Sequence, residues 1–101
     1  MDWNEIMKPR ITMCLTKDGQ FEMSVNEAGR DELIELLNGL DRKHEHFHMA
    51  PEEFEHDCAV AEIPYRTTDR VLSWGKVLFR PDDWDREHFS HVTTENPEGS
   101  T

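Results

Sequence analysis

Three histidines at alternate positions are the residues in this sequence whose types and spacing best suit metal chemistry. They are His44, His46 and His48. In a strand, alternate side chains share one face, so these imidazoles would lie close enough to bind zinc or another first-row metal. A further metal ligand could come from the segment that contains His56, Asp57 and Cys58. The alternative is a solvated, pH-sensitive histidine run without a metal, and the sequence predicts no bound cofactor.

Nucleophilic catalysis finds less support than metal binding. Cys14 lies in an alternating strand pattern, which predicts a buried and unreactive thiol. Cys58 follows His56 by two residues, but spacing identifies no third group to orient an imidazole. The two cysteines form no CxxC motif, so we expect two buried free thiols rather than a disulfide. The chain also lacks nucleophile-elbow, phosphate-loop and Rossmann motifs. We therefore predict that the protein is not an enzyme.

Composition places the chain among small acidic proteins. It has 101 residues, 22 acidic and 11 basic residues, a formal charge of −11 and a hydrophobic fraction of 36%. One modest core is possible, so we expect a single domain over residues 1–94 and a flexible tail over 95–101. No apolar run is long enough for a membrane helix or a signal peptide, which predicts a cytoplasmic protein that does not bind membranes. The negative charge argues against nucleic acid as a partner.

The acidic residues are concentrated in two segments. Residues 41–62 and residues 81–101 each carry a net charge of −5, whereas the remainder carries −1. Such clusters are either an ordinary solvated surface or a face that attracts a basic protein. On the second interpretation, the predicted partner-binding residues are six carboxylates and two aromatic anchors: Glu45, Glu52, Glu53, Asp82, Asp83, Asp85, Phe47 and Trp84.

Local patterns predict a hairpin followed by a helix. Apolar residues alternate over residues 10–16 and again over 21–25, and the Asp18-Gly19 pair between them is typical of a hairpin turn. Asn26 can cap the following helix, and Ser24 with Glu27 is an alternative capping box. The helix is expected to end at a left-handed Gly39. It is expected to pack on the hairpin through leucines at three- and four-residue spacing: Leu33, Leu36, Leu37 and Leu40.

The second half of the chain is expected to add two strands. Residues 41–58 are polar and irregular, with a short helical turn over residues 51–54. Residues 59–63 and 71–80 have strand composition; Trp74 is expected in the core, Gly75 at a bulge, and Pro81 as the end of the second strand. The predicted class is α+β, in the order strand-strand-helix-strand-strand: a small antiparallel or mixed four-stranded sheet with one amphipathic helix packed on one face.

The sequence also resembles a known family over residues 10–80. A hairpin leads to a helix ending in Leu-Ile-Glu-Leu-Leu-Asn-Gly-Leu, and Asp41 and the run His-Glu-His-Phe-His-Met follow. A strand-like segment near residues 77–79 completes the similarity. In these features the chain resembles the immunity protein 32 family of bacterial polymorphic toxin systems.

The resemblance implies a non-enzymatic inhibitor that protects the producing cell by binding a toxin encoded beside it. An acidic surface would suit a basic toxin domain, because complementary charge accelerates association. Two other functions remain open from the sequence alone. One is a small metal-binding protein or metalloenzyme built on the three histidines, and the other is an accessory domain whose charge serves solubility.

Overall fold

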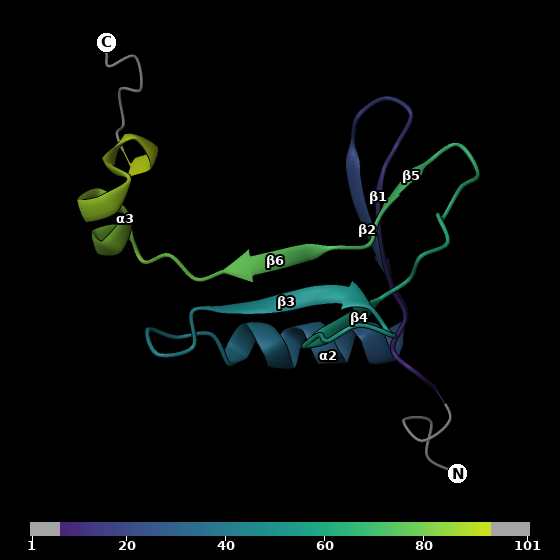
Figure 1. Ribbon diagram of the computed structural model, residues 1–101, viewed down its shortest axis with the longest axis horizontal. Helices are drawn as coiled ribbons and strands as arrows, with labels where there is room; N and C mark the ends of the chain where they lie inside the picture. Colours follow the sequence, from purple (N-terminus) through teal and green to yellow (C-terminus); the bar gives the residue numbers. More distant parts are fainter. Residues whose placement is uncertain (1–6, 94–101) are drawn as a thin grey trace.

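The computed structural model describes residues 7–93 and shows an α+β protein with two three-stranded sheets (Figure 1). One sheet has the strand order β2-β1-β5 and the other has the order β4-β3-β6. The strands are β1 (Ile11–Leu15), β2 (Phe21–Val25), β3 (His46–Pro51), β4 (Cys58–Val60), β5 (Arg70–Leu72) and β6 (Gly75–Leu78). The helices are α2 (Glu27–Asn38), α3 (Asp82–His88) and the 3₁₀ helix η1 (Ser90–Thr93). The single four-stranded sheet predicted from the sequence is therefore wrong, although the α+β class is confirmed.

The hairpin forms as its sequence predicts. β1 and β2 pair antiparallel, with Met13 opposite Met23 at the centre. The turn closes through hydrogen bonds from the Gly19 N–H to the Thr16 carbonyl and from the Thr16 N–H to the Gln20 carbonyl, each 2.8 Å long. Gly19 has a φ of +86°, which glycine adopts without strain.

Helix α2 begins at the cap that the sequence favoured first. The Asn26 side chain accepts a hydrogen bond from the Gly29 N–H at 2.8 Å, whereas Ser24 belongs to β2 and caps nothing. Gly39 ends the helix with a φ of −83°, so the expectation of a left-handed cap is wrong. Its N–H instead bonds to the Glu35 and Leu36 carbonyls of the last turn.

The hydrophobic core lies between α2 and both sheets. Ile11 and Met13 of β1 enter it from one sheet, and β3 and β4 line it from the other. Four further core residues come from these two strands: Phe47, Met49, Cys58 and Val60. Leu33 and Leu36 of α2, and Leu40 just beyond its end, pack against this cluster, so this segment contacts more than the hairpin that the sequence predicted. Leu37 was expected in the same stripe, but it is half exposed.

Strand β3 occupies a segment that the sequence analysis treated as irregular. Phe47 and Met49 point into the core, while His46 and His48 alternate with them. β3 runs parallel to β4 and antiparallel to β6, which fixes it at the centre of its sheet. Pro51 is its last residue, and a hydrogen bond from the Phe54 N–H to the Pro51 carbonyl closes a single turn over residues 51–54, where the sequence predicted a short helical turn.

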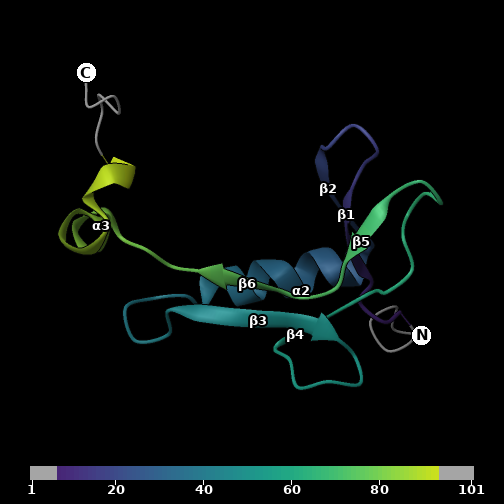
Figure 2. The ribbon, with the colours of Figure 1, turned by 45° about the horizontal axis from the view of Figure 1, so that its top comes forward.

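The predicted strand over residues 71–80 is broken into two. β5 pairs with β1, and β6 pairs with β3, so the chain crosses from one sheet to the other at Ser73 and Trp74 (Figure 2). Gly75 begins β6 at this crossing rather than forming a bulge within one strand. Trp74 is 60% exposed and contacts the Phe54 ring at 4.9 Å, so its assignment to the core is wrong.

The chain continues past Pro81 as a helix that the sequence analysis missed. Pro81 is the N-cap of α3, and three acids occupy the first turn while Arg86 and His88 occupy the last. That distribution of charge favours a helix through its dipole. Figure 1 shows α3 and η1 at the end of the molecule far from the hairpin. The tail predicted over 95–101 lies outside the described residues.

Strand β4, which follows the turn over residues 51–54, is shorter than predicted. β4 covers Cys58–Val60 rather than residues 59–63, and Ile63 is 79% exposed. The two sheets are joined where the Ala61 N–H donates to the Ile11 carbonyl at 2.8 Å. Among residues 7–93, no helix is both long and apolar enough to cross a bilayer.

The close approach of α2 to β1 predicts opposite outcomes at two glycines. A Cβ on Gly29 would lie 2.6 Å from the Arg10 carbonyl oxygen, whereas a Cβ on Gly39 would have no neighbour closer than 3.6 Å. We expect Gly29→Ala to lower the free energy of unfolding by about 1–3 kcal/mol because α2 must move off β1. Gly39→Ala is the matched control and should leave stability unchanged or raise it by up to about 1 kcal/mol. Urea denaturation measures both, and equal effects would contradict the packing described.

Candidate protein-binding surface

The carboxylates predicted to bind a partner lie at opposite ends of β3. Glu45 directly precedes the strand, and Glu52 and Glu53 directly follow it. Six residues of strand span roughly 20 Å. The predicted set therefore does not form one continuous surface, and each end has its own electrostatic environment.

An ion pair joins the two acidic segments of the sequence at the α3 end. Both terminal guanidinium nitrogens of Arg42 donate to the Asp83 carboxylate, at 3.0 and 3.3 Å. The hydrogen bond from Arg42 lowers the pKa of Asp83 below its ordinary value. Glu45 lies 3.9 Å from Arg80 in the same region. Local arginines thus offset part of the negative charge that the sequence analysis assigned to a basic partner.

Trp84 is already engaged by its own neighbours. The Arg80 guanidinium lies 4.4 Å from the indole centroid, and the His88 ring lies 4.4 Å away from it. The cation–π contact and the ring contact leave the indole half-buried. A small groove beside Trp84 is lined by Arg42, Glu45, Phe79, Arg80 and Pro81. Asp82 and Asp85 lie on α3 itself, in its first turn.

Phe47 is not available as an anchor. Its side chain is 4% exposed and belongs to the core, where β3 places it opposite Val77 of β6. The predicted role of Phe47 in partner binding is therefore wrong. Since β3 is the central strand of its sheet, the alternation that exposes His46 and His48 also turns Phe47 inward.

At the other end of β3, acidic side chains lie close to one another. Glu53 shares a hydrogen bond with Glu62, and this bond and the negative field of Glu53 raise the pKa of Glu62. Glu52 lies 3.9 Å from Lys8, but both side chains are mostly exposed, and such pairs contribute little to stability. The carboxylates at this end are thus less compensated than those beside α3.

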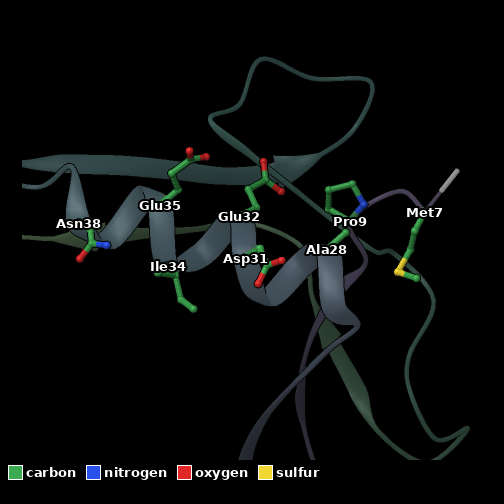
Figure 3. Close-up of a pocket in the computed structure, with 8 residues that line it drawn as sticks. All are labelled: Met7, Pro9, Ala28, Asp31, Glu32, Ile34, Glu35 and Asn38. Atoms are coloured by element: carbon green, nitrogen blue, oxygen red, sulfur yellow. The ribbon is translucent and has the colours of Figure 1, made fainter. Parts of the chain in front are cut away.

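Helix α2 adds carboxylates that are not among the partner-binding residues predicted from the sequence. Figure 3 shows Glu32 and Glu35 projecting from one side of α2, with Asp31 on the same helix. Burial raises the pKa of Glu32, and the charge of Glu35 raises it further, while His56 acts in the opposite direction. This interaction places Glu32 near the loop between β3 and β4. Amphipathic spacing marked these residues as exposed but could not show which loop they face.

We name this region the acidic face and define it by five residues of α2 and of the loop between β3 and β4: Asp31, Glu32, Glu35, Glu55 and Asp57. Three shallow grooves cross it. The first includes Asp31, Glu32 and Glu35, the second Glu55 and Asp57, and the third Glu35 and Asp57. Within the part of the chain that the structure describes, no lysine or arginine lines any of these grooves.

The histidines line the acidic face without forming a metal centre. The His46 and His48 rings touch edge-on at 4.8 Å, and Asp57 accepts a hydrogen bond from the His48 N–H at 2.8 Å. His44 lies in the loop before β3, where its N–H donates to Asp41. Among residues 7–93, no three histidine, cysteine, aspartate or glutamate side chains are placed to hold a metal ion together. The structure therefore gives no support to the metal-binding alternative.

The two cysteines are buried free thiols, as the sequence predicted. Burial, together with the charges of Glu32 and Asp57, raises the pKa of Cys58 to about 11. A thiol with that pKa is almost entirely protonated at neutral pH, so Cys58 is a poor nucleophile.

Comparison of the chain with models of protein families, with curated protein sequences and with solved structures gives no match.

The pKa of Cys58 predicts slow alkylation of the folded protein. Relative to a thiol of pKa 9.0, a pKa of about 11 lowers the thiolate fraction about 100-fold at pH 8. We expect iodoacetamide to modify Cys58 at least that much more slowly in the native protein than in urea. Peptide mass spectrometry measures the rate at each cysteine, and equal rates in both states would contradict the buried environment.

The contact between Glu53 and Glu62 predicts a pH-dependent gain in stability for Glu62→Gln. The folded-state pKa of Glu62 is raised above the ordinary value of 4.5, so its ionisation destabilises the fold as pH rises through that raised pKa. Glu62→Gln should therefore raise the melting temperature at pH 7 and leave it unchanged at pH 3. Glu55→Gln removes the same charge from the loop and is the control. A gain at pH 3 as large as that at pH 7 would show that repulsion is not the cause.

Proposed function

We propose that this protein is a non-enzymatic immunity protein, which neutralises a toxin encoded beside it by direct binding through the acidic face. The toxin is a basic protein domain, and the bound state blocks its action without chemical change to either protein. The observation that carries the proposal is the concentration of carboxylates in the acidic face, whose grooves have no lysine or arginine among their lining residues. Asp31 is paired with Arg30 at 3.0 Å outside those linings, and the remaining carboxylates give the face its negative charge.

The shape of the acidic face supports a protein partner. Its grooves are open and shallow, and the groove along α2 contains the apolar side chains of Met7, Pro9 and Ile34 beside its carboxylates (Figure 3). Protein interfaces combine apolar contacts with a polar rim in this way. A lysine or arginine of the partner would meet Glu32 and Glu35, and an apolar side chain of the partner would contact Ile34.

Electrostatics further supports a basic partner. A formal charge of −11 attracts a basic domain over a Debye length of about 10 Å at ordinary salt. Attraction of this kind raises the rate at which two proteins meet. Glu32 adds a specific gain, because a cation beside it favours the ionised form that burial disfavours.

The resemblance to the immunity protein 32 family gives the proposal its biological setting. The helix ending at Gly39 and the following histidine run, which carry that resemblance, form one wall of the acidic face in the structure. Glu35 and Leu36 of the helix and His44 and His46 of the run line the same groove. The motif residues therefore lie together at the surface proposed to bind the toxin.

Two matched double charge reversals test which surface binds. Glu32→Lys with Glu35→Lys alters the acidic face, and Asp82→Lys with Asp85→Lys alters α3 by the same total charge. With the basic toxin domain encoded beside this chain, we expect the first pair to weaken binding at least 10-fold and the second to change it less than 3-fold. Surface plasmon resonance between 50 and 300 mM salt measures the affinity and the association rate.

The outcomes separate three possibilities. Loss of affinity with the α2 reversals alone supports the acidic face, and loss with the α3 reversals alone moves the interface to α3 and overturns the assignment. If neither pair alters the affinity, or if the association rate does not fall with salt, the electrostatic account is wrong. Survival of cells that express the toxin with each variant gives the functional readout.

A further inference from the structure

β2 is an edge strand whose free side is unpaired in the described part of the chain. It is the outer strand of the order β2-β1-β5, and Figure 2 shows it at the outside of the hairpin. The Asn26 N–H donates to the Arg10 carbonyl, which identifies the even-numbered residues of β2 as those bonded to β1. The backbone N–H and C=O groups of Phe21, Met23 and Val25 therefore point away from β1 toward the free side.

The same three residues expose their side chains. Phe21 is 51% exposed, Met23 39% and Val25 40%, and all three lie on one face of the strand. Their partners in β1 include Ile11 and Met13, which are buried. β2 thus presents a row of apolar side chains directly beside a row of unpaired backbone groups.

The edge lacks the charges that commonly keep such strands apart. Natural edge strands carry lysines, prolines or bulges that oppose pairing with another chain. β2 has none of these, and its one charged residue, Glu22, is bound to Arg66 at 2.7 Å. The carboxylate is turned toward Arg66 of the same chain, so the edge offers little negative charge to a basic partner.

We propose that two copies of this chain pair through β2, antiparallel and around a two-fold axis at Met23. In this register Phe21 faces the partner's Val25, and Met23 faces the partner's Met23. Each of the three facing pairs forms two hydrogen bonds, roughly six in total. The result is one continuous sheet across both copies, with β2 of each copy at its centre.

The register is complementary to itself in charge as well as in shape. Glu22 faces the partner's Ser24, so no two like charges lie opposite each other on the second face of the strand. Phe21 against the partner's Val25 is an aromatic and β-branched pair, which stabilises antiparallel strands. The acidic face lies on α2 and the loop between β3 and β4, so the dimer leaves it free for another protein.

Disulfide trapping tests the register. In the proposed dimer, the two Met23 Cα atoms lie about 5.5 Å apart, within the range of a disulfide. The two Phe21 Cα atoms lie about 14 Å apart, because four residues of strand separate them along the axis. Mild oxidation should therefore cross-link Met23→Cys but not Phe21→Cys. A mixture of Phe21→Cys and Val25→Cys should cross-link only as the mixed pair.

Sedimentation equilibrium tests the dimer itself. We expect the full chain to have twice its monomer mass of 11.9 kDa. Met23→Lys places two like charges at the two-fold axis and should weaken dimerisation at least 10-fold. Leu37→Lys makes a similar change on α2, away from the edge, and should leave the dimer intact. Because both copies are acidic, dimerisation should strengthen with salt, the opposite of binding to a basic toxin.

Three results would overturn the proposal: a monomer at 100 μM in 300 mM salt, equal cross-linking of Met23→Cys and Phe21→Cys, or an equal effect of the two lysine variants. None of these results depends on toxin binding. Failure of the dimer is therefore distinguishable from failure of the proposed function.

Discussion

Asn26 connects the start of β1 to the start of α2, and the positions of the remaining elements depend on this connection. Its side-chain oxygen accepts from the Gly29 N–H and the Arg10 N–H, and its amide nitrogen donates to the Lys8 carbonyl. Its own backbone N–H donates to Arg10. Asn26 thus caps the helix and also joins the end of β2 to the residue before β1, at the open end of the hairpin. This brings α2 against Ile11. Loss of this side chain would remove a helix cap and two tertiary hydrogen bonds together.

This connection also explains why the two faces of the molecule differ. Helix α2 is held over the junction of the two sheets, where Ile11 accepts a hydrogen bond from Ala61. One helix cannot cover both sheets, so the apolar side of β2 extends beyond it. The radius of gyration is 16.8 Å, against about 13 Å for a compact chain of this length. The acidic face forms where α2 meets the loop before β4, on residues that the core does not use.

Local signals predicted the first half of the fold, and long-range pairing determined the second. The hairpin and α2 follow from Gly19, Asn26 and the leucine spacing, each of which acts over a few residues. β3 was missed because its histidines suggested chemistry, although Phe47 and Met49 alternate with them as in any half-buried strand. The candidate site was also predicted incompletely, because its geometry depends on contacts between residues far apart in the sequence. Linear clustering of acids did not show that Arg42 offsets Asp83, or that α2 faces the loop that contains Asp57.

The distribution of charge along the chain allows two interactions with opposite electrostatic needs. Residues 11–25, which form the hairpin, contain Lys17, Asp18 and Glu22 as their charged residues, a net charge of −1. Most of the charge of −11 therefore lies away from the β2 edge, and screening over about 10 Å weakens its effect there. The same charge acts at short range on the acidic face, where a basic partner would contact it directly. A chain with its acids spread evenly would repel a second copy at β2 and would present a weaker field at α2.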